Sequence, residues 1–406
     1  MKATGFISSR IFSFSKENLS SVVMKIAVVS IALGISIMLI SISVIVGFKN
    51  QIKEKVVGFV NPIQIQALNQ NESIEETPFI YDSVLKSRLE LPFVKSIYPT
   101  ANKAGIVKTD DEIHGIVLKG VDKDYDWNYI KSNLVEGEAP QYDENERSND
   151  VLISKIISDK MMLNLGDEVR VWFVGENMKT RGRKFFIKGI YETGLTECDE
   201  RFIYCDLNQI IRLNGWDENM VGHLEVDVVD DFSVEEANSI IYYKIPTNLI
   251  SYEAKDLYPQ IYDWLELQDM NVVIIIVLML LVAGITIISM LLIIVLERTS
   301  TIGILKSMGA NNVFIRRIFL QRSQRILLIG MLLGNIFGIG LCLVQKYTEI
   351  IKLSPESYYL SSVPIEINWL YVLLLNLGTF VLWVLMMSIP TMIINNIKPS
   401  KSIRFE

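Results

Sequence analysis

The sequence predicts a polytopic α-helical membrane protein with four transmembrane helices and a large mixed α/β extracytoplasmic domain between the first two. Three observations predict this fold class. Four long apolar runs contain no charged residue. A charge-rich segment of 223 residues separates the first run from the second. The mean hydropathy of the 406-residue chain is positive, at +0.32.

Composition excludes several other classes. Half of the residues are hydrophobic and only 3 are Cys, which excludes a disordered chain and a disulfide-dense scaffold. The formal net charge is −7, which argues against a nucleic-acid partner. The high apolar fraction also argues against a purely cytosolic enzyme.

The apolar runs predict four membrane-spanning helices. They cover residues 26–48, 272–296, 326–344 and 369–394. Each one reaches about the 20 residues that cross the hydrocarbon layer. The first run is longer than the apolar stretch of roughly 7–15 residues in a signal peptide, and no small-residue cleavage site follows it. We therefore expect a retained signal-anchor helix rather than a cleaved signal.

Charge asymmetry predicts the orientation. The segments 1–25, 297–325 and 395–406 together hold 13 Lys or Arg against 3 Asp or Glu. The positive-inside rule places these three segments in the cytoplasm. Segment 49–271 holds 24 basic and 40 acidic residues, and we expect it to lie on the external side of the membrane, together with the short loop 345–368. Both termini are then cytoplasmic.

The residues before the first run predict an amphipathic segment. Ile7, Ile11 and Phe14 recur at helical spacing beside Arg10. This pattern is typical of a helix that lies at the membrane surface. We expect segment 1–25 to be such a cytoplasmic amphipathic segment.

The external segment reads as mixed α and β, in one or two subdomains. Runs rich in Val, Ile and aromatic residues predict strands, at Ile63–Ala67, Gly115–Lys119, Glu168–Val174, Phe185–Tyr191 and Phe202–Cys205. Helical spacing predicts helices over 72–91 and 233–243. Ser233 and Glu236 match a capping box at the start of the second helix. Gly166 marks a turn before the third strand.

Catalytic motifs are absent from the sequence. His114 and His223 are 109 residues apart and lack the spacing of a metal site, so we expect structural or surface roles for both. The sequence contains neither a GxSxG elbow nor a GxxxxGK[ST] phosphate loop. We expect a non-catalytic chain that binds no cofactor or metal of its own.

Two cysteines of the external domain raise the question of a disulfide. Cys198 and Cys205 are seven positions apart, in a compartment where disulfides persist. Spacing alone does not establish the Cα distance that a disulfide requires. The sequence therefore leaves this pairing open.

A basic hairpin stands out in the acidic domain. The segment GENMKTRG lies between two predicted strands, with Lys179 and Arg181 close to Arg183. Two readings stay open, a solubilising loop and a hairpin that docks a partner protein. The residues of the candidate docking hairpin are Gly175, Asn177, Met178, Lys179, Arg181 and Gly182.

Small residues recur inside two of the apolar runs. Gly330, Gly334 and Gly338 are spaced by four in the third run, and Ser30 and Gly34 share a helix face in the first. Small residues allow two membrane helices to approach closely. Packing within the chain and a subunit interface both remain open.

The loop between the second and third runs predicts a short amphipathic helix. Ile302, Leu305 and Met308, with Ile304, lie at helical spacing, and Gly309 ends the pattern. A helix held between two spans is suited to insertion into a groove of another protein. The alternative is a helix lying on the lipid headgroups.

Several stretches resemble the FtsX-like, MacB-type family of ABC transporter permeases, specifically its lipoprotein-releasing (LolC/LolE-type) branch. The loop ERTSTIGILKSMGANNVFIRRIFL is similar to the family's segment between spans two and three. FISSRIF, SIALGISIMLISISVIVGFKNQI and the tail IKPSKSIRFE resemble the branch's ends. LKGVD, LNLGDEVRV and IKGIYETGLTECDERFIYCDL resemble motifs of its periplasmic domain. The resemblance extends over essentially the whole chain.

The resemblance implies a permease subunit in the inner membrane of a Gram-negative bacterium. Two permease subunits, identical or related, would pair with two cytoplasmic ATPases that bind ATP and Mg²⁺. The client would be a lipoprotein, passed to a periplasmic chaperone. The resemblance implies a coupling helix that contacts the ATPase, comprising Glu297, Arg298, Ile302, Gly303, Ile304, Leu305, Lys306, Met308, Gly309 and Ala310.

Two departures from the family accompany this resemblance. The family's REIG reads Ser300–Thr301–Ile302–Gly303 here, and the basic hairpin is shorter than a chaperone-hooking one. Two alternatives share the fold, a MacB-type exporter of peptides or toxins and an FtsX-type regulator of periplasmic cell-wall hydrolases. A membrane-anchored enzyme is disfavoured because no catalytic constellation is present.

Overall fold

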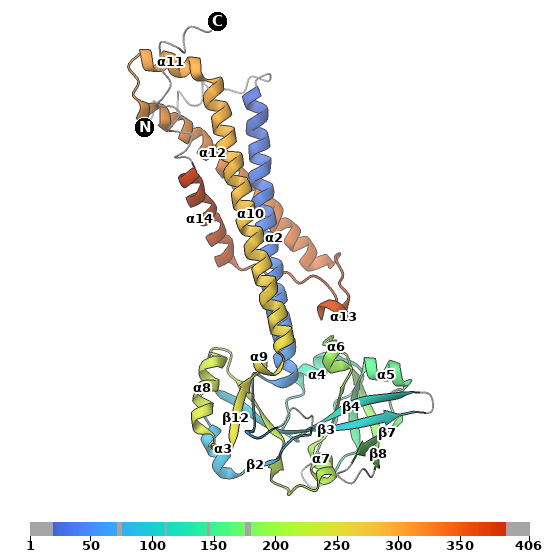
Figure 1. Cartoon of the computed structure of the whole chain (residues 1–406). Helices are drawn as coiled ribbons and strands as arrows, with labels where there is room; N and C mark the ends of the chain where they lie inside the picture. The colour runs from blue at the N-terminus through green and yellow to red at the C-terminus, as the bar shows by residue number, and fades with distance from the viewer. Residues whose placement is uncertain (1–18, 71–74, 110–111, 144–146, 175–179, 387–406) are drawn as a thin grey trace. The chain divides into compact units, whose positions relative to one another are not determined.

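The computed structural model describes residues 19–70, 75–109, 112–143, 147–174 and 180–386 (Figure 1). The chain divides into two compact units. A helical unit holds residues 1–49, 264–352 and 362–406, and an α/β unit holds residues 50–263 and 353–361. The predicted amphipathic segment falls mostly within residues 1–18. Those residues, the end of the fourth run and the C-terminal tail lie outside the described residues.

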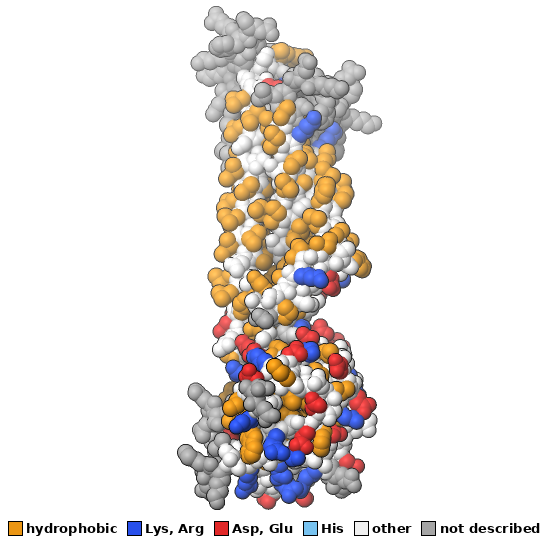
Figure 2. All heavy atoms as spheres, turned by 90° about the vertical axis from the view of Figure 1, so that its right-hand side faces the viewer, with side chains coloured by type: hydrophobic (Ala, Val, Ile, Leu, Met, Phe, Trp, Pro, Cys, Tyr) orange, Lys and Arg blue, Asp and Glu red, His pale blue; other side chains and the backbone are white. Residues whose placement is uncertain are grey.

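Within the described residues, four helices are long and apolar enough to cross a membrane, as predicted. The described helices that enter the helical unit are α2 (Leu19–Val60), α10 (Pro259–Glu297), α11 (Thr299–Ser307), α12 (Asn312–Thr348) and α14 (Trp369–Met386). Figure 2 shows hydrophobic side chains spread over the surface of these helices. Three of the four, α2, α10 and α12, extend well beyond the apolar runs that predicted them.

The α/β unit is built on one large sheet. Its strands are β1 (Ile63–Ala67), β3 (Val94–Lys108), β4 (Ile113–Val121), β5 (Leu134–Gly137), β6 (Asp150–Ser154), β7 (Glu168–Val174), β8 (Thr180–Tyr191), β9 (Phe202–Asp206), β11 (His223–Val228) and β12 (Leu249–Glu253). The order is β12-β1-β11-β3-β4-β9-β6-β8-β5, and β7 pairs with β3 and β8. β2 (Phe79–Ile80) and β10 (Met220–Val221) form a separate two-stranded sheet.

Short helices pack beside the strands of this unit. They are α3 (Ser83–Leu89), α4 (Asn128–Ser132), α5 (Lys155–Met161), α6 (Thr196–Asp199), α7 (Leu207–Asn214), α8 (Val234–Lys244), α9 (Ala254–Leu257) and α13 (Pro355–Tyr358). The five predicted strands all form, as β1, β4, β7, β8 and β9. Gly166 has a φ of +86°, so the predicted turn before β7 needs glycine.

Of the two helices predicted for this domain, the first does not form as predicted and the second does. The range 72–91 is wrong as one helix, because β2 occupies Phe79–Ile80 and, among the described residues of this range, only α3 is helical. Pro78 cannot donate a backbone hydrogen bond, which disfavours a helix through that position. The second helix forms as α8 with Ser233 as its N-cap, but the Ser233 side chain makes no cap hydrogen bond. The predicted capping box is therefore not formed.

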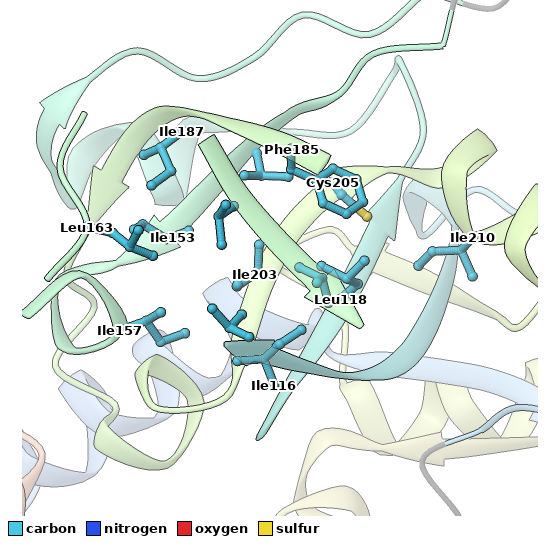
Figure 3. Packing of buried hydrophobic residues seen from close by; sticks show 14 of the residues in the cluster. Ile116, Leu118, Ile153, Ile157, Leu163, Phe185, Ile187, Ile203, Cys205 and Ile210 are labelled. Atoms are coloured by element: carbon cyan, nitrogen blue, oxygen red, sulfur yellow. The ribbon is translucent and has the colours of Figure 1, made fainter. Parts of the chain in front are cut away.

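Two hydrophobic clusters hold the sheet to its helices. One packs β6, β7, β8 and β9 against α5 and α7, and Figure 3 shows Ile153, Phe185 and Ile203 within it. The other packs β1, β11 and β12 against α3 and α8. Alternation along β1, with Ile63 and Ile65 buried, explains which face meets this second cluster.

Candidate functional site

The loop between α10 and α12 forms the short helix that the sequence predicted. α11 ends in a Schellman arrangement, in which the Ala310 amide donates to the Leu305 carbonyl and the Gly309 amide to the Lys306 carbonyl, both at 3.0 Å. Gly309 has a φ of +90°, a conformation that other residues rarely adopt. Gly309 therefore stops the helix, as the sequence indicated.

The apolar residues of α11 divide between two faces. Ile302 is fully buried and shares a cluster with Ile315 and Ile318 of α12, and Leu305 packs against the same cluster. Ile304 and Met308 lie on the other face, with 50% and 78% of their surface exposed. An exposed apolar pair four residues apart has the spacing of anchors on a helix that docks into a groove.

The other residues of the predicted coupling set lie within α11 or directly before it. Gly303 is buried, whereas Glu297 is exposed. Arg298 is the N-cap residue of α11, without a side-chain cap hydrogen bond. Lys306 lies in the last turn, where a cation is favoured by the helix dipole.

The glycines of α12 pack against α2 within the same chain. A Cβ added at Gly330, Gly334 or Gly338 would lie 2.8–3.1 Å from atoms of α2. The Ser36 hydroxyl donates to the Gly334 carbonyl at 2.9 Å. This geometry favours the intramolecular reading of the glycine ridge.

The α2 residues proposed for packing lie elsewhere. A Cβ added at Gly34 would meet no atom within 4 Å, so Gly34 makes no close approach to α12. Ser30 is only half-buried. The face that meets the glycines carries Ile31, Ala32 and Ile35 instead, because these residues lie on another side of the same helix.

Amide and indole groups join α12 to α14, which the sequence analysis missed. The Asn335 and Asn376 side chains donate to one another at 2.8 and 3.0 Å. The Trp383 indole donates to the Ser323 hydroxyl at 2.9 Å. Polar side chains of this kind hydrogen-bond neighbouring helices in membranes. The available signal was a single Asn inside each of the third and fourth apolar runs, Asn335 and Asn376.

The basic hairpin is described only in part. β7 and β8 pair as an antiparallel hairpin, with Trp172 opposite Gly182. Arg181 and Gly182 are exposed at the start of β8. Gly175, Asn177, Met178 and Lys179 lie outside the described residues.

Cys198 and Cys205 are both buried and free. Cys198 belongs to α6 and Cys205 to β9, where its side chain joins the sheet's hydrophobic cluster. The disulfide that the spacing left open is therefore not formed.

A buried ionic cluster lies at the end of α2 inside the α/β unit. The Lys119 ammonium is 2.7 Å from Glu225 and donates to the Phe59 carbonyl at 2.6 Å. His223 Nδ1 lies 2.7 Å from a Glu76 oxygen, and the Asn61 amide donates to Glu225 at 2.9 Å. Lys119 also lies 5.0 Å from the centre of the Phe59 ring, within the range of a cation–π contact.

The charges of this cluster shift the pKa values of its members. Burial opposes the charged form of His223, but Glu76 and Glu225 outweigh it and raise the pKa of His223 to about 9. Burial likewise disfavours ionised Glu225, yet Lys119 and His223 lower its pKa to about 2. Among the described residues, no group of His, Cys, Asp and Glu is arranged to hold a metal ion. His223 is a member of an ion-pair cluster with Glu76 and Glu225.

Fold and site together define a polytopic membrane protein with an α/β domain inserted in its chain and an exposed helix between two spans. The model of the MacB-like periplasmic core domain matches residues 26–241, and that of the FtsX-like permease C-terminal region matches residues 273–399. The chain belongs to the FtsX-like permease family that carries a MacB-like periplasmic core domain. It is a protein of the bacterial inner membrane, and members of this class are non-catalytic permease subunits.

Curated relatives resemble the chain over most of its length. The lipoprotein-releasing system transmembrane protein LolE of Haemophilus influenzae is 23% identical over 389 residues, which cover 92% of both chains. LolC of Buchnera aphidicola is 23% identical over 372 residues, covering 90% of this chain and 88% of its own. The solved periplasmic region of MacB from Actinobacillus actinomycetemcomitans is 13% identical, with a TM-score of 0.34, and covers 50% of this chain and 92% of that one.

Proposed function

We propose that this chain is the transmembrane permease subunit of an ABC transporter that extracts lipoproteins from the inner membrane and releases them to a periplasmic carrier. The observation that carries this proposal is the similarity to LolE and LolC over about nine-tenths of the chain. The relatives bear the name of a lipoprotein-releasing system. The four spans lack charged residues, which suits a client with an apolar lipid anchor rather than an ion.

In this proposal α11 is the coupling helix. Ile304 and Met308 insert into a groove of a cytoplasmic ATPase, while buried Ile302 fixes α11 to α12. Two ATPases bind ATP and Mg²⁺, and a second permease subunit, identical or related, completes the complex. This chain binds no cofactor itself. A photo-crosslinker at Lys306 tests the contact, because capture of an ATP-binding subunit supports it and its absence from the crosslinked products contradicts it.

The proposed orientation follows from the charges. The loop that contains α11 carries 6 Lys or Arg and 1 Glu, so it is cytoplasmic together with both termini. The acidic α/β unit is then periplasmic and inserted between the first and second spans. Its basic hairpin, which includes Arg181 and Gly182, is the proposed contact for a lipoprotein chaperone.

Depletion of the protein tests the function. Triacylated lipoproteins should accumulate in the inner membrane, and normal delivery to the outer membrane without a redundant paralogue contradicts the proposal. The match of residues 26–241 to a MacB-like domain favours a MacB-type exporter as the second candidate. Co-purification with a trimeric outer-membrane channel would select that exporter, and a bound cell-wall hydrolase would select an FtsX-type regulator.

A further inference from the structure

Part of the connection between α12 and α14 belongs to the α/β unit. Residues 353–361 form one compact unit with residues 50–263. The Leu353 amide donates to the Ser361 carbonyl at 2.9 Å, which closes this segment into a loop. Leu360 is buried. The segment is therefore a folded part of the unit and not a free linker.

Lys55, in the last turns of α2, holds this segment in place. Its ammonium donates to the Tyr359 carbonyl at 3.1 Å and to the Thr193 carbonyl in the connection between β8 and α6. Three segments that are far apart in the sequence therefore meet at one cation. Hydrogen bonds from a charged donor are stronger than those between neutral groups.

Asp199 fixes the conformation of the β8–α6 connection, whose Thr193 carbonyl accepts the hydrogen bond from Lys55. The buried carboxylate accepts hydrogen bonds from the Thr193 amide and hydroxyl, at 3.0 and 2.7 Å, and from the Gly194 amide at 2.9 Å. These bonds fix the Thr193 carbonyl toward Lys55. Gly194 has a φ of +76°, and a Cβ there would lie 2.5 Å from the Lys55 nitrogen. Glycine thus leaves the space that the ammonium occupies.

Side chains reinforce the same contact. The Tyr359 hydroxyl donates to Glu197 at 3.3 Å, and the Thr196 hydroxyl donates to the Pro355 carbonyl at 3.4 Å. Tyr359 itself has a φ of +58°, which turns its carbonyl out of α13. The start of α6, at Thr196 and Glu197, therefore contacts segment 353–361 at Pro355 and Tyr359.

We propose that Lys55 is a positioning residue that clasps the α12–α14 connection to α2 and to the α/β unit, so that these segments move together during transport. Its role in transport rests on the proposed function, whereas the clasp itself does not. Without Lys55, two carbonyls lose their shared donor and segment 353–361 is released.

Hydrogen–deuterium exchange of the full-length protein in lipid nanodiscs tests the clasp. Lys55→Met should raise the exchange rate of segment 353–361 by about tenfold, since hydrogen bonds to a charged group contribute about that factor or more. Lys53→Met is the matched control, because Lys53 is exposed two residues away on the same helix. Equal exchange in the two variants would overturn the clasp.

A second variant, which leaves Lys55 in place, distinguishes loss of the clasp from a folding defect caused by the Lys55 substitution. Gly194→Ala places a methyl group where the ammonium lies, so it should raise exchange in segment 353–361 without changing α2. Lys55→Arg keeps the charge and should restore part of the protection. Unchanged exchange in Gly194→Ala contradicts the proposal.

The purified complex with its ATPase, given a triacylated lipoprotein, tests the role in transport. Lys55→Met should retain ATP hydrolysis and lose release by about tenfold, matching the hydrogen bonds removed, while Lys53→Met retains both. Normal release by Lys55→Met with raised exchange overturns the transport role alone. If the unmodified complex releases no lipoprotein, the proposed function fails and exchange still decides the clasp.

Discussion

Lys119, Glu225, His223 and Glu76 place four ionisable groups in the interior of the α/β unit. The side chains of Lys119 and Glu225 are only 3% and 1% exposed. Removing charges from water is costly, so each needs an opposite charge at close range. Here Lys119 and protonated His223 balance the two carboxylates. The cluster therefore holds the end of α2 against β4 and β11 through the Phe59 carbonyl and the Asn61 amide.

Removing one member should leave an uncompensated buried charge. Glu225→Gln should destabilise the protein by about 3–5 kcal/mol, seen as a lower unfolding midpoint in detergent. Asp227→Asn is the matched control, because Asp227 pairs with the exposed Lys95 two positions along β11. It should cost about 1 kcal/mol or less. Equal losses in both variants would contradict a special role for the cluster.

The same cluster predicts a dependence on pH. His223 has a folded pKa of about 9 and an unfolded value near 6.5. Its stabilisation is therefore complete below about pH 6.5 and is lost as the pH rises through 9, by about 3 kcal/mol. Unfolding followed from pH 6.5 to 9.5 should show this loss in the unmodified protein and not in His223→Gln. Parallel curves for the two would refute it.

The sequence could not reveal this cluster. Glu76 and His223 are 147 residues apart and meet only because strands distant in sequence pair in the sheet. A lone histidine and a lone lysine carry no spacing that indicates a partner. The cysteines illustrate the same limit, since seven positions permitted a disulfide but different elements hold the two thiols.

At the scale of elements, the close contact between α2 and α12 depends on glycines, which carry no side chain. Gly334→Val should push the helices apart, because a Cβ there lies 2.8 Å from the Ala32 carbonyl oxygen and Ile35. Overpacking of this kind costs about 1–3 kcal/mol. Gly340→Ala is the control on the same helix, where a Cβ meets nothing within 4 Å. Thermal unfolding in detergent should separate the two variants, and equal midpoints would contradict the packing argument.

If the exposed face of α11 docks the proposed ATPase, substitutions on that face should weaken ATPase binding without unfolding the permease. Ile304→Asp with Met308→Asp should reduce co-purification of the ATPase at least tenfold while the permease stays folded, because both side chains are exposed and buried interface anchors contribute about 2 kcal/mol each. Ser300→Asp adds charge to an exposed position of the same helix and should have a small effect. Retained binding in the double variant would exclude α11 as the docking helix.

Helical periodicity predicted α11 and its stop at Gly309 correctly, yet it failed over residues 72–91. A short apolar run with helical spacing also fits a strand when tertiary pairing favours one. Phe79 and Ile80 pair with β10, a strand about 140 residues later. The partner that decides the outcome is therefore invisible to a local pattern.

At the scale of the whole molecule, the sequence predicted four long apolar helices but not their full lengths. Hydropathy ends the first run at Phe48, where charges begin. α2 nevertheless continues to Val60, because Ile52, Val56 and Phe59 extend a helical apolar stripe that is buried in the α/β unit. The helical spacing of apolar residues beyond Phe48, rather than mean hydropathy, was the sequence signal for this extension.

The unbroken course of α2 has a consequence for how motion is passed along it. A 42-residue helix is about 63 Å long and turns by about 100° per residue. Each residue from Leu19 to Val60 is therefore turned by a fixed angle relative to every other residue of the helix. One alanine inserted after Phe48 adds about 1.5 Å but shifts the phase of all later residues by about 100°. In the transporter proposed above, the insertion should abolish lipoprotein release while ATP hydrolysis by the partner persists. Gln51→Ala keeps the helical phase and should leave both activities intact. Normal lipoprotein release with the inserted alanine would mean that α2 transmits displacement alone.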